Sequence, residues 1–378
     1  MHNYIPRLLS TEILEDAKYF PVLVITGPRQ SGKTSLCRHL YPDYTYVNLE
    51  DITNRAKATN DPTQFLESLG EAAIIDEVQR VPDLMSMIQV RVDENKKLRY
   101  VLTGSSNFSL LRTVTQSLAG RAALFTLLPL SFQEFPKDQL SKSINQLMWQ
   151  GQYPGVIADK VSVNRFYSNY YNTYVERDLR DLLKLRNLLT FDKFVKLLAV
   201  RVGSEFNASA LAREVGVSSN TISEWLSLLT TSYIAYTLPP YFLNISKRLT
   251  KMPKVYFYDT GLLCYLLGIE SFEDIGNNPL RGAIFENLAM SELLKSRLNK
   301  AKNPNLYFYR EKSGIEVDAL LMEGGEIKLY EIKAGKTIRP EAYDNINAVK
   351  RTLNNILSST IIFDGESFPP ASINIRDI

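Results

Sequence analysis

The sequence predicts an α/β fold with a parallel-sheet core, a helical middle and a second, smaller α/β region at the C-terminal end. Three observations predict it. The apolar run Val22–Ile25 leads directly into a glycine-rich loop and then a helix-like segment. The run Ala72–Ile75 is continuously apolar, as buried parallel strands are, and ends in two acids. Near the C-terminus, Ile315–Leu321 and Ile327–Ala334 are strand-like and place acids on one face by a period of two.

The glycine-rich loop has the pattern G-x-x-x-x-G-K-T in a strand–loop–helix setting, which predicts a nucleoside triphosphate site. Its glycines allow backbone conformations that a Cβ would hinder, so that N–H groups can point at phosphate oxygens. The lysine supplies charge for the β- and γ-phosphates, and the threonine hydroxyl is placed to ligate Mg²⁺. The alternative is a glycine turn before a helix. The residues expected to bind the nucleotide are Gly27, Pro28, Arg29, Gln30, Ser31, Gly32, Lys33, Thr34 and Ser35.

Acidic and small polar residues follow the next strands along the chain. We expect Asp76 to complete the Mg²⁺ shell and Glu77 to act as the base that orients the attacking water. A capping Asp would give the same pattern. After the strand Arg99–Gly104, Ser106 and Asn107 can contact the γ-phosphate or the lytic water, and the alternative for them is a loop cap.

An arginine follows the tight turn Leu118–Gly120. Arg121 can act as a finger on the nucleotide of a neighbouring subunit, or it can anchor the nearby sheet through a salt bridge. Arg91 and Arg112 are rival candidates for the finger. The sequence does not decide between these alternatives.

Together these motifs resemble those of AAA+ ATPases, and more narrowly those of a bacterial and archaeal group. The matching segments are Gly27–Thr34, Asp76–Gln79, Leu102–Asn107, Leu118–Arg121 and Leu127–Phe135. The resemblance implies ATP hydrolysis with Mg²⁺, Asp76 and Glu77 as Walker B residues, and Ser106 and Asn107 as sensors. It also implies a homo-oligomer, with a hexamer-type ring as one form, because AAA+ sites commonly lie between subunits.

Length and composition indicate a multidomain cytoplasmic protein. A chain of 378 residues predicts two or three domains, which we expect at 1–140, 141–270 and 271–378. The net charge of +3 does not by itself indicate a nucleic-acid-binding protein, so any surface that binds nucleic acid would have to be a local basic patch. Cys37 and Cys264 form no disulfide framework, and we find no secretory leader and no membrane span.

The middle third predicts a winged helix-turn-helix. Ser209–Val215 and a helix that begins at Ser219 flank the turn Gly216–Ser218, and Tyr233–Pro240 and Lys254–Tyr258 are the expected wing strands. The run Lys247–Lys254 contains four cations and no acid, so we expect salt-dependent, mostly sequence-independent DNA binding through the wing. The alternative is a packing or protein-contact module.

The last third carries acids that can hold a metal ion. Asp318 and Glu331 can bind Mg²⁺, with Mn²⁺ as an alternative, and Lys333 can position water or stabilise charge developing at a phosphodiester. These three residues stand in the order and spacing of the PD-(D/E)XK nuclease superfamily. Glu286, in a helix expected over Pro279–Arg297, matches the acid that its first helix often carries. The resemblance implies a restriction-endonuclease-like domain with Glu286, Asp318 and Glu331 at the metal. Such domains also serve as inactive DNA-binding or assembly platforms.

Three functional hypotheses follow. The first is an AAA+ ATPase acting on DNA, such as branched DNA or repair intermediates, whose C-terminal domain cuts or grips the substrate. The second is a nucleotide-controlled switch whose C-terminal domain only binds. The third is a remodeller of protein partners.

Overall fold

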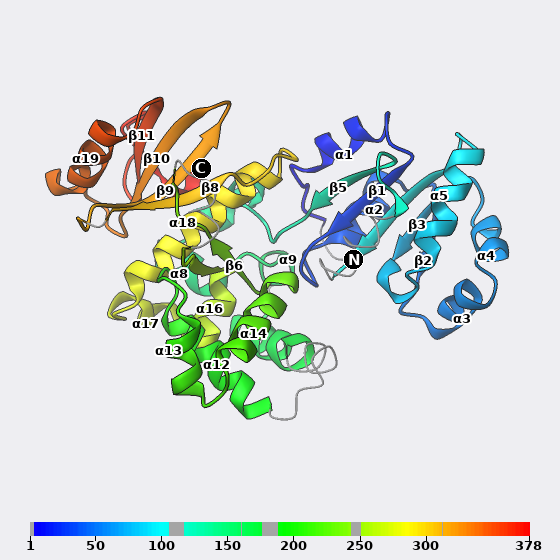
Figure 1. Cartoon of the computed structure of the whole chain (residues 1–378), viewed down its shortest axis with the longest axis horizontal. Helices are drawn as coiled ribbons and strands as arrows, with labels where there is room; N and C mark the ends of the chain where they lie inside the picture. Colours follow the sequence, from blue (N-terminus) through cyan, green and yellow to red (C-terminus); the bar gives the residue numbers. More distant parts are fainter. Residues whose placement is uncertain (1–3, 106–116, 160, 176–187, 243–250, 312) are drawn as a thin grey trace. The chain divides into compact units, whose positions relative to one another are not determined.

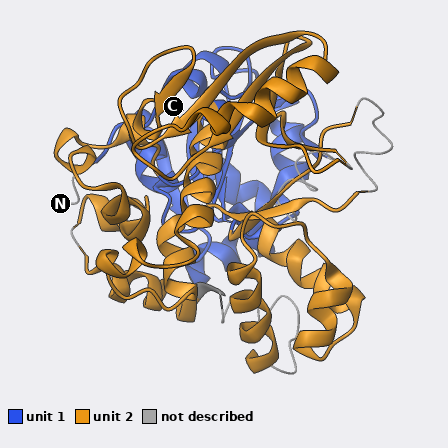
Figure 2. Cartoon of the chain, turned by 90° about the vertical axis from the view of Figure 1, so that its left-hand side faces the viewer, with its two compact units in different colours: residues 1–129, 231–233, 297–302 blue, residues 130–230, 234–296, 303–378 orange. Residues whose placement is uncertain are grey.

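The computed structural model describes residues 4–105, 117–159, 161–175, 188–242, 251–311 and 313–378. It confirms the predicted α/β class, with a parallel-sheet core and a second, C-terminal mixed sheet (Figure 1). The chain divides into two compact units (Figure 2). The first comprises residues 1–129, 231–233 and 297–302, and the second comprises residues 130–230, 234–296 and 303–378.

The first unit is built on a five-stranded sheet in the order β2-β3-β4-β1-β5, in which all pairings are parallel. The strands are β1 (Val22–Thr26), β2 (Thr45–Asn48), β3 (Ala72–Asp76), β4 (Arg99–Gly104) and β5 (Ala122–Thr126). Every residue of β1 is buried, which its branched apolar residues favour. Because the strands are parallel, the loop after β1 opens at the same sheet edge as the ends of β3 and β4.

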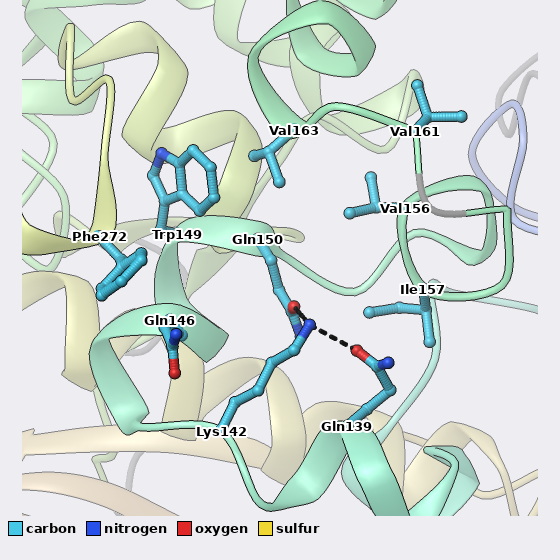
Figure 3. Close-up of a pocket in the computed structure, with 10 residues that line it drawn as sticks. All are labelled: Gln139, Lys142, Gln146, Trp149, Gln150, Val156, Ile157, Val161, Val163 and Phe272. Atoms are coloured by element: carbon cyan, nitrogen blue, oxygen red, sulfur yellow. Dashed lines mark hydrogen bonds between the residues drawn. The ribbon is translucent and has the colours of Figure 1, made fainter.

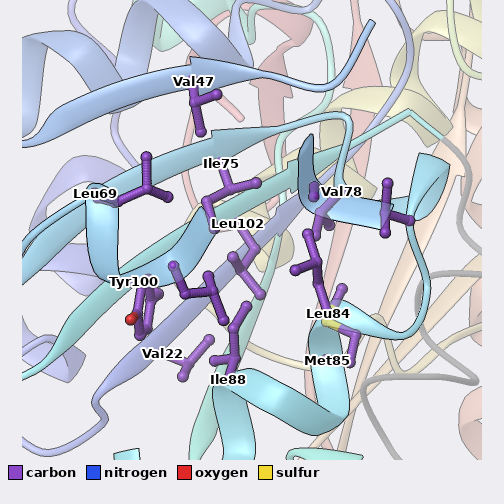
Figure 4. Close-up of a cluster of buried hydrophobic side chains, with 14 of the residues drawn as sticks. Val22, Val47, Leu69, Ile75, Val78, Leu84, Met85, Ile88, Tyr100 and Leu102 are labelled. Atoms are coloured by element: carbon purple, nitrogen blue, oxygen red, sulfur yellow. The ribbon is translucent and has the colours of Figure 1, made fainter. Parts of the chain in front are cut away.

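Helices cover both faces of this sheet. They are α1 (Ser10–Asp16), α2 (Lys33–Leu40), α3 (Ile52–Asn60), α4 (Pro62–Ser68), η1 (Val78–Arg80) and α5 (Leu84–Glu94). Val22 and Val24 pack in a cluster that includes Met85 and Ile88 of α5 (Figure 4). Leu23 and Ile25, on the opposite face, pack in a cluster with residues of α1 and α2. The alternation along β1 therefore gives each face its own apolar core.

The second unit begins with a helical region. Its elements are η2 (Phe132–Glu134), α7 (Lys137–Leu140), α8 (Ile144–Gln150), α9 (Pro154–Ile157), α10 (Val163–Tyr170), the π-helical turn η3 (Tyr171–Val175), α12 (Leu188–Val200), α13 (Ala208–Val215) and α14 (Ser219–Thr231). No helix among the described residues combines the length and the apolar character that crossing a membrane requires.

Helices α13 and α14 and a short strand pair lie where the sequence predicts a helix-turn-helix and a wing. Gly216 ends α13 in the left-handed conformation, at φ +87°, and the Ser218 hydroxyl accepts a hydrogen bond from the Thr221 N–H at 3.1 Å. Strands β6 (Ala235–Leu238) and β7 (Lys254–Phe257) pair antiparallel. The first strand is shorter than expected, because Tyr233 takes a positive φ of +57° that interrupts extended backbone.

The C-terminal part of the second unit holds a five-stranded mixed sheet in the order β12-β11-β10-β9-β8. Its elements are α16 (Thr260–Leu266), α17 (Phe272–Gly276), α18 (Arg281–Leu298), β8 (Leu306–Arg310), β9 (Glu316–Glu323), β10 (Glu326–Ile332), η4 (Pro340–Tyr343), α19 (Asp344–Thr352), β11 (Ile356–Phe363), β12 (Ser372–Asn374) and η5 (Ile375–Asp377). Strands β9 and β10 form a hairpin across Gly324 and Gly325, both at positive φ. The helix expected from Pro279 begins at Arg281.

Candidate functional site

The glycine-rich loop between β1 and α2 is held by a close backbone contact. Gly27 has φ +145°, and a Cβ at this position would lie 2.1 Å from the Leu127 carbonyl oxygen, so only glycine fits. Gly32, at φ +95°, lies directly before α2, whose first residue is Lys33. The loop N–H groups and the α2 N-terminus together form the kind of cradle that binds phosphate.

Lys33 lies inside this loop. Its ammonium donates hydrogen bonds to the carbonyl oxygens of Gly27 at 2.9 Å and Pro28 at 2.7 Å, and the residue is buried. Burial lowers the pKa of Lys33 to about 8, against the opposing effect of the Glu77 and Asp76 carboxylates. An anionic phosphate placed in the loop would favour the charged ammonium.

Arg7, which lies outside the loop, and Ser31, which lies within it, show how the loop is fixed and which of its polar groups lacks a partner. The Arg7 guanidinium is buried and donates to the carbonyl oxygens of Ser31 at 2.8 Å and Leu128 at 2.7 Å, which ties the loop to the segment after β5. The Ser31 hydroxyl is buried and has no hydrogen-bond partner among the described residues. A buried hydroxyl without a partner fits a loop built to meet a phosphate oxygen.

The other expected nucleotide-binding residues differ in exposure. Pro28 is buried, Arg29 is half-buried, and Gln30 and Ser35 are exposed. Gln30 has a left-handed φ of +60°. Arg29 Nη2 lies 3.5 Å from Glu50, which also pairs with Arg80 at 2.8 Å.

Asp76, at the end of β3, is buried, and its carboxylate accepts hydrogen bonds from hydroxyl groups of three described residues. Thr34 Oγ1 donates to Oδ2 at 2.7 Å, Tyr46 OH donates to Oδ2 at 3.0 Å, and Thr103 donates to Oδ1. The two residues expected to hold Mg²⁺, Thr34 and Asp76, are therefore in direct contact. A hydroxyl beside a carboxylate is a set of hard oxygen ligands that suits Mg²⁺.

Glu77 is held in a left-handed conformation, with φ +56°, which costs a non-glycine residue about 1–3 kcal/mol. Its carboxylate accepts hydrogen bonds from Gln79 and, at 3.1 Å, from Ser105 at the end of β4. Neighbouring side chains thus hold it beside the loop-facing end of the sheet. Backbone strain of this kind clusters at functional sites.

The remaining predicted residues of this site are placed as follows. Ser106, Asn107 and Arg112 lie outside the described residues. Arg121 donates to both carboxylate oxygens of Asp93 of α5, at 2.7–3.0 Å, and this hydrogen bonding lowers the pKa of Asp93. Arg91 lies 3.6 Å from Glu67. In this structure Arg121 therefore forms a salt bridge, which is the anchoring role that the sequence analysis gives as the alternative to an arginine finger.

Tyr233 was predicted only as part of a wing strand, but it contacts the strand that leads into the loop. Its hydroxyl lies 2.8 Å from Thr26 Oγ1, and Thr26 directly precedes Gly27. The side chain is buried and the backbone φ is +57°. A bulky residue in this strained conformation, with its hydroxyl against Thr26, is a position that sequence patterns do not reveal.

The second group of predicted residues lies in the C-terminal sheet. Strands β9 and β10 bring Asp318 and Glu331 together, and Asp318 Oδ2 accepts the Ile332 N–H at 2.8 Å. Lys333 donates to Glu331 Oε1 at 2.7 Å, while Glu331 Oε2 is buried without a partner among the described residues. Burial, together with the charges of Glu286 and Glu331, raises the pKa of Asp318 well above its usual range.

Glu286 of α18 is occupied by two donors from β7. Tyr256 OH donates to Glu286 Oε1 at 2.6 Å, and Lys254 Nζ lies 3.5 Å from the same oxygen. Lys254 also pairs with Glu316 Oε1 at 2.6 Å and lies 5.4 Å from the centroid of the Phe308 ring. The ammonium of Lys254 is thus surrounded by carboxylates and an aromatic face.

One expectation changes with this finding. Lys254 was expected to be a wing cation free to meet DNA phosphate, but it is buried in an ion-pair cluster, so that expectation is wrong. Burial alone would lower the pKa of Lys254, but nearby carboxylates, above all Glu286, outweigh it and raise the pKa. Of the other three cations in the run, Lys251 is exposed, while Lys247 and Arg248 lie outside the described residues.

The acidic cluster does not fit a divalent metal in this arrangement. The unpartnered Glu331 Oε2 is a free ligand atom, but Lys254 and Tyr256 occupy Glu286, and a backbone N–H occupies Asp318 Oδ2. Within the described part of the chain, no set of three or more Asp, Glu, His or Cys side chains is placed to hold a metal ion. The ammonium of Lys254 pairs with Glu286, and that of Lys333 pairs with Glu331.

Comparison with known proteins gives three family matches along the chain. Residues 19–136 match an AAA domain, residues 141–273 match a domain of unknown function (DUF8612), and residues 281–374 match another (DUF4143). The chain is 33% identical over 325 residues to the uncharacterized protein Rv2008c of Mycobacterium tuberculosis, covering 84% of this chain and 71% of that protein. The uncharacterized protein Mb2031c of Mycobacterium bovis matches to the same extent.

Two further matches are more distant. The uncharacterized protein MJ1544 of Methanocaldococcus jannaschii is 24% identical over 400 residues, covering 94% of this chain and 85% of that protein. Among solved structures, the Walker-type ATPase PABY2304 of Pyrococcus abyssi has a TM-score of 0.43 at 16% identity, covering 70% of this chain and 96% of that one. A TM-score this low does not bear on function.

The close approach at Gly27 gives a first prediction. Gly27→Ala places a Cβ against the Leu127 carbonyl, so we expect a loss of at least about 2 kcal/mol in the free energy of unfolding and loss of nucleotide binding. Gly282→Ala is the control, because a Cβ at Gly282 meets nothing within 4 Å. Urea unfolding and titration with a fluorescent ATP analogue measure both effects. Wild-type affinity in Gly27→Ala would contradict the prediction.

The cluster around Lys254 gives a second prediction. Lys254→Met leaves Glu286 and Glu316 without their ammonium partner, so we expect a loss of about 1–3 kcal/mol in the free energy of unfolding. Lys328→Met removes a more exposed pair with Glu323, at 3.0 Å, and should cost less than about 1 kcal/mol. Chemical denaturation measures both variants.

A metal titration completes this test. Because Lys254 already pairs with Glu286 and Lys333 with Glu331, Mn²⁺ should leave the Tm of the nucleotide-free wild-type protein unchanged. A rise in Tm that Asp318→Asn abolishes would show that the metal binds at the cluster, against this prediction.

Proposed function

This chain belongs to the same family as the mycobacterial proteins Rv2008c and Mb2031c and carries an AAA domain over residues 19–136, and from this premise we propose that it is a Mg²⁺-dependent ATPase that acts on DNA. One observation carries the ATPase part. Thr34 and Asp76 are hydrogen-bonded at 2.7 Å beside a loop that encloses Lys33. This combination supports binding of a nucleotide together with its metal.

In the proposed reaction each side chain has a separate task. The loop N–H groups and Lys33 bind the β- and γ-phosphates, and Thr34 and Asp76 hold Mg²⁺. When bound, Mg²⁺ neutralises charge on the phosphate oxygens. Glu77 accepts a proton from the attacking water, and its hydrogen bonds from Ser105 and Gln79 keep its carboxylate in one orientation.

We further propose that the protein works as a homo-oligomer, with a hexamer-type ring as one form. AAA domains commonly place an arginine of one subunit at the nucleotide of the next. Arg121 would reach a neighbour only by leaving Asp93, with which it forms a bidentate pair. Arg91 has a longer and less constrained ion pair, at 3.6 Å, and is the second candidate.

The DNA part of the proposal rests on the second unit. Helices α13 and α14 are joined by a tight capped turn, and α14 exposes uncharged polar residues, including Asn220, Ser223 and Ser227. Such side chains suit phosphate contacts more than base reading. With Lys254 buried, the wing cations that support this proposal are Lys247, Arg248 and Lys251, so we expect weak, salt-sensitive, sequence-independent binding.

For the C-terminal region we propose a binding or assembly role in place of cleavage. The observation that favours this is the ion pair of Lys254 with Glu286, one of the three carboxylates that the expected nuclease site would need for its metal. The same observation supports the second candidate function, a nucleotide-controlled switch or protein remodeller whose C-terminal region is a platform. DNA-dependence of the ATPase separates the two.

The hydrolysis step is tested at Glu77. Glu77→Gln keeps the shape of the side chain but removes the base, so ATP binding should persist while the turnover rate falls by about a hundredfold or more. Glu94→Gln, at an exposed position of α5, is the matched control and should retain full activity. Phosphate release and nucleotide titration measure the two quantities. Full turnover in Glu77→Gln would exclude it as the base.

DNA action is tested by the ATPase rate with duplex, single-stranded and branched DNA at low salt. We expect stimulation that disappears as salt rises, because phosphate contacts release counterions. A rate unchanged by every DNA would reject the DNA proposal and favour the protein remodeller. Incubation of DNA with Mg²⁺ or Mn²⁺ should give no cleavage. Cleavage that Lys333→Ala abolishes would instead establish a nuclease.

A further inference from the structure

The second unit contains a pocket that the proposed ATPase does not use. It encloses about 290 Å³ and is formed by α7, α8, α9, the start of α10 and the start of α17 (Figure 3). This size is at the lower end of small-molecule sites. The lining is apolar except at one end, where Lys142 and glutamine side chains come together.

The polar end of the pocket has a donor without an acceptor. Lys142 Nζ donates hydrogen bonds to Gln139 Oε1 at 2.7 Å and to Gln150 Oε1 at 2.6 Å. An ammonium can only donate, so the oxygen of the Gln150 amide must face it and the NH₂ group must face elsewhere. Gln150 Nε2 is buried and has no partner among the residues that the structure describes, so it has lost its hydrogen bonds to water without a replacement.

The positive charge of Lys142 faces uncharged hydrogen-bond partners. In the described part of the chain, its ammonium donates to the neutral amides of Gln139 and Gln150. Burial lowers the pKa of Lys142, and the charge of Asp138 offsets this effect only in part. A ligand with one negative charge and hydrogen-bond acceptors would satisfy both Lys142 and Gln150.

The remaining lining of the pocket favours an apolar group of a ligand. Trp149 of α8 and Phe272 of α17 form an edge-to-face pair with ring centroids 6.2 Å apart. Val156 and Ile157 are buried, and Val161 is 38% exposed at the rim. An aromatic or branched group placed here would cover this apolar surface.

We propose that this pocket binds a carboxylate attached to an apolar group, with the carboxylate between Lys142 and Gln150 Nε2 and the apolar group against Trp149. A single ammonium and one amide match a monoanion, whereas phosphate sites usually gather several backbone N–H groups or arginine. The C-terminal residue of a peptide and a free hydrophobic acid share this chemistry.

Calorimetric titration of the full chain tests the proposal with four probes. They are N-acetyl-alanyl-phenylalanine with a free C-terminus, its C-terminal amide, 3-phenylpropionate and acetate. We expect both apolar acids to bind, and the amide and acetate to bind at least about tenfold more weakly. Tighter binding of the peptide than of phenylpropionate identifies a chain terminus as the ligand, and the opposite order identifies a free acid.

Gln150→Glu is the decisive variant, because it keeps the side-chain shape and the acceptor for Lys142 but replaces the unpartnered donor with a carboxylate oxygen. It should raise the Tm of the free protein and abolish binding of the acids, a combination that a purely structural role for Gln150 does not produce. Gln64→Glu, at an exposed position of α4 that is not part of the pocket lining, adds the same charge, so acid binding should weaken by less than about threefold.

Three results would overturn the proposal. They are equal binding of the free acid and the amide, unchanged acid binding in Gln150→Glu, and no binding of either acid at millimolar concentration. If Gln150→Glu does not fold, Lys142→Met serves in its place, and wild-type affinity in that variant would likewise reject the site.

Discussion

The contact between the Gly27 backbone and the Leu127 carbonyl is the constraint on which the nucleotide site depends. It fixes the start of the loop against the segment that follows β5, and Arg7 fixes the middle of the loop to the same segment through Leu128. With the loop held at both points, Lys33 can turn inward onto the carbonyls of Gly27 and Pro28. The neighbouring Thr34 then meets Asp76 at the end of β3.

The two acidic sites of the chain differ in the chemistry of their hydrogen-bond donors. Asp76 receives hydrogen bonds from neutral hydroxyls, which orient the carboxylate without adding a positive charge. Glu286 and Glu316 face the ammonium of Lys254. A carboxylate of the first kind can attract a cation, whereas one of the second kind already has one. Similar acidic residues on strands and helices therefore support different functions, and residue type alone does not distinguish them.

Local patterns predicted much of the fold. The positions of β1, β3 and β4 follow from apolar runs, and the turn between α13 and α14 follows from Gly216 and Ser218, because these signals depend on neighbours in the chain. The contact of Asp318 with β10 also agrees with the strand period and hairpin spacing.

The interactions that the sequence did not predict are long-range. Arg7 acts on carbonyls 24 and 121 residues away, and Tyr233 meets Thr26 across 207 residues. Lys254 looked like a solvated wing cation because its partners Glu286 and Glu316 lie on other elements. The periodicity of apolar residues does not predict such long-range ion pairs and hydrogen bonds, since they depend on how whole helices and strands pack. The expected roles of Ser106 and Asn107 stay predictions, because those residues lie outside the described part of the chain.

The attachment of β7 to α18 has a consequence for recombination between relatives. Besides Lys254 and Tyr256, Phe257 is bound through its backbone to Asn287, with N–H and C=O contacts of 2.7 and 2.9 Å, and its carbonyl also accepts from Ser291 at 3.1 Å. A chimera joined near residue 270 would separate each of these groups from the partner with which it is matched. A chimera joined before residue 130, where the second unit begins, would take all of these residues from the same parent protein.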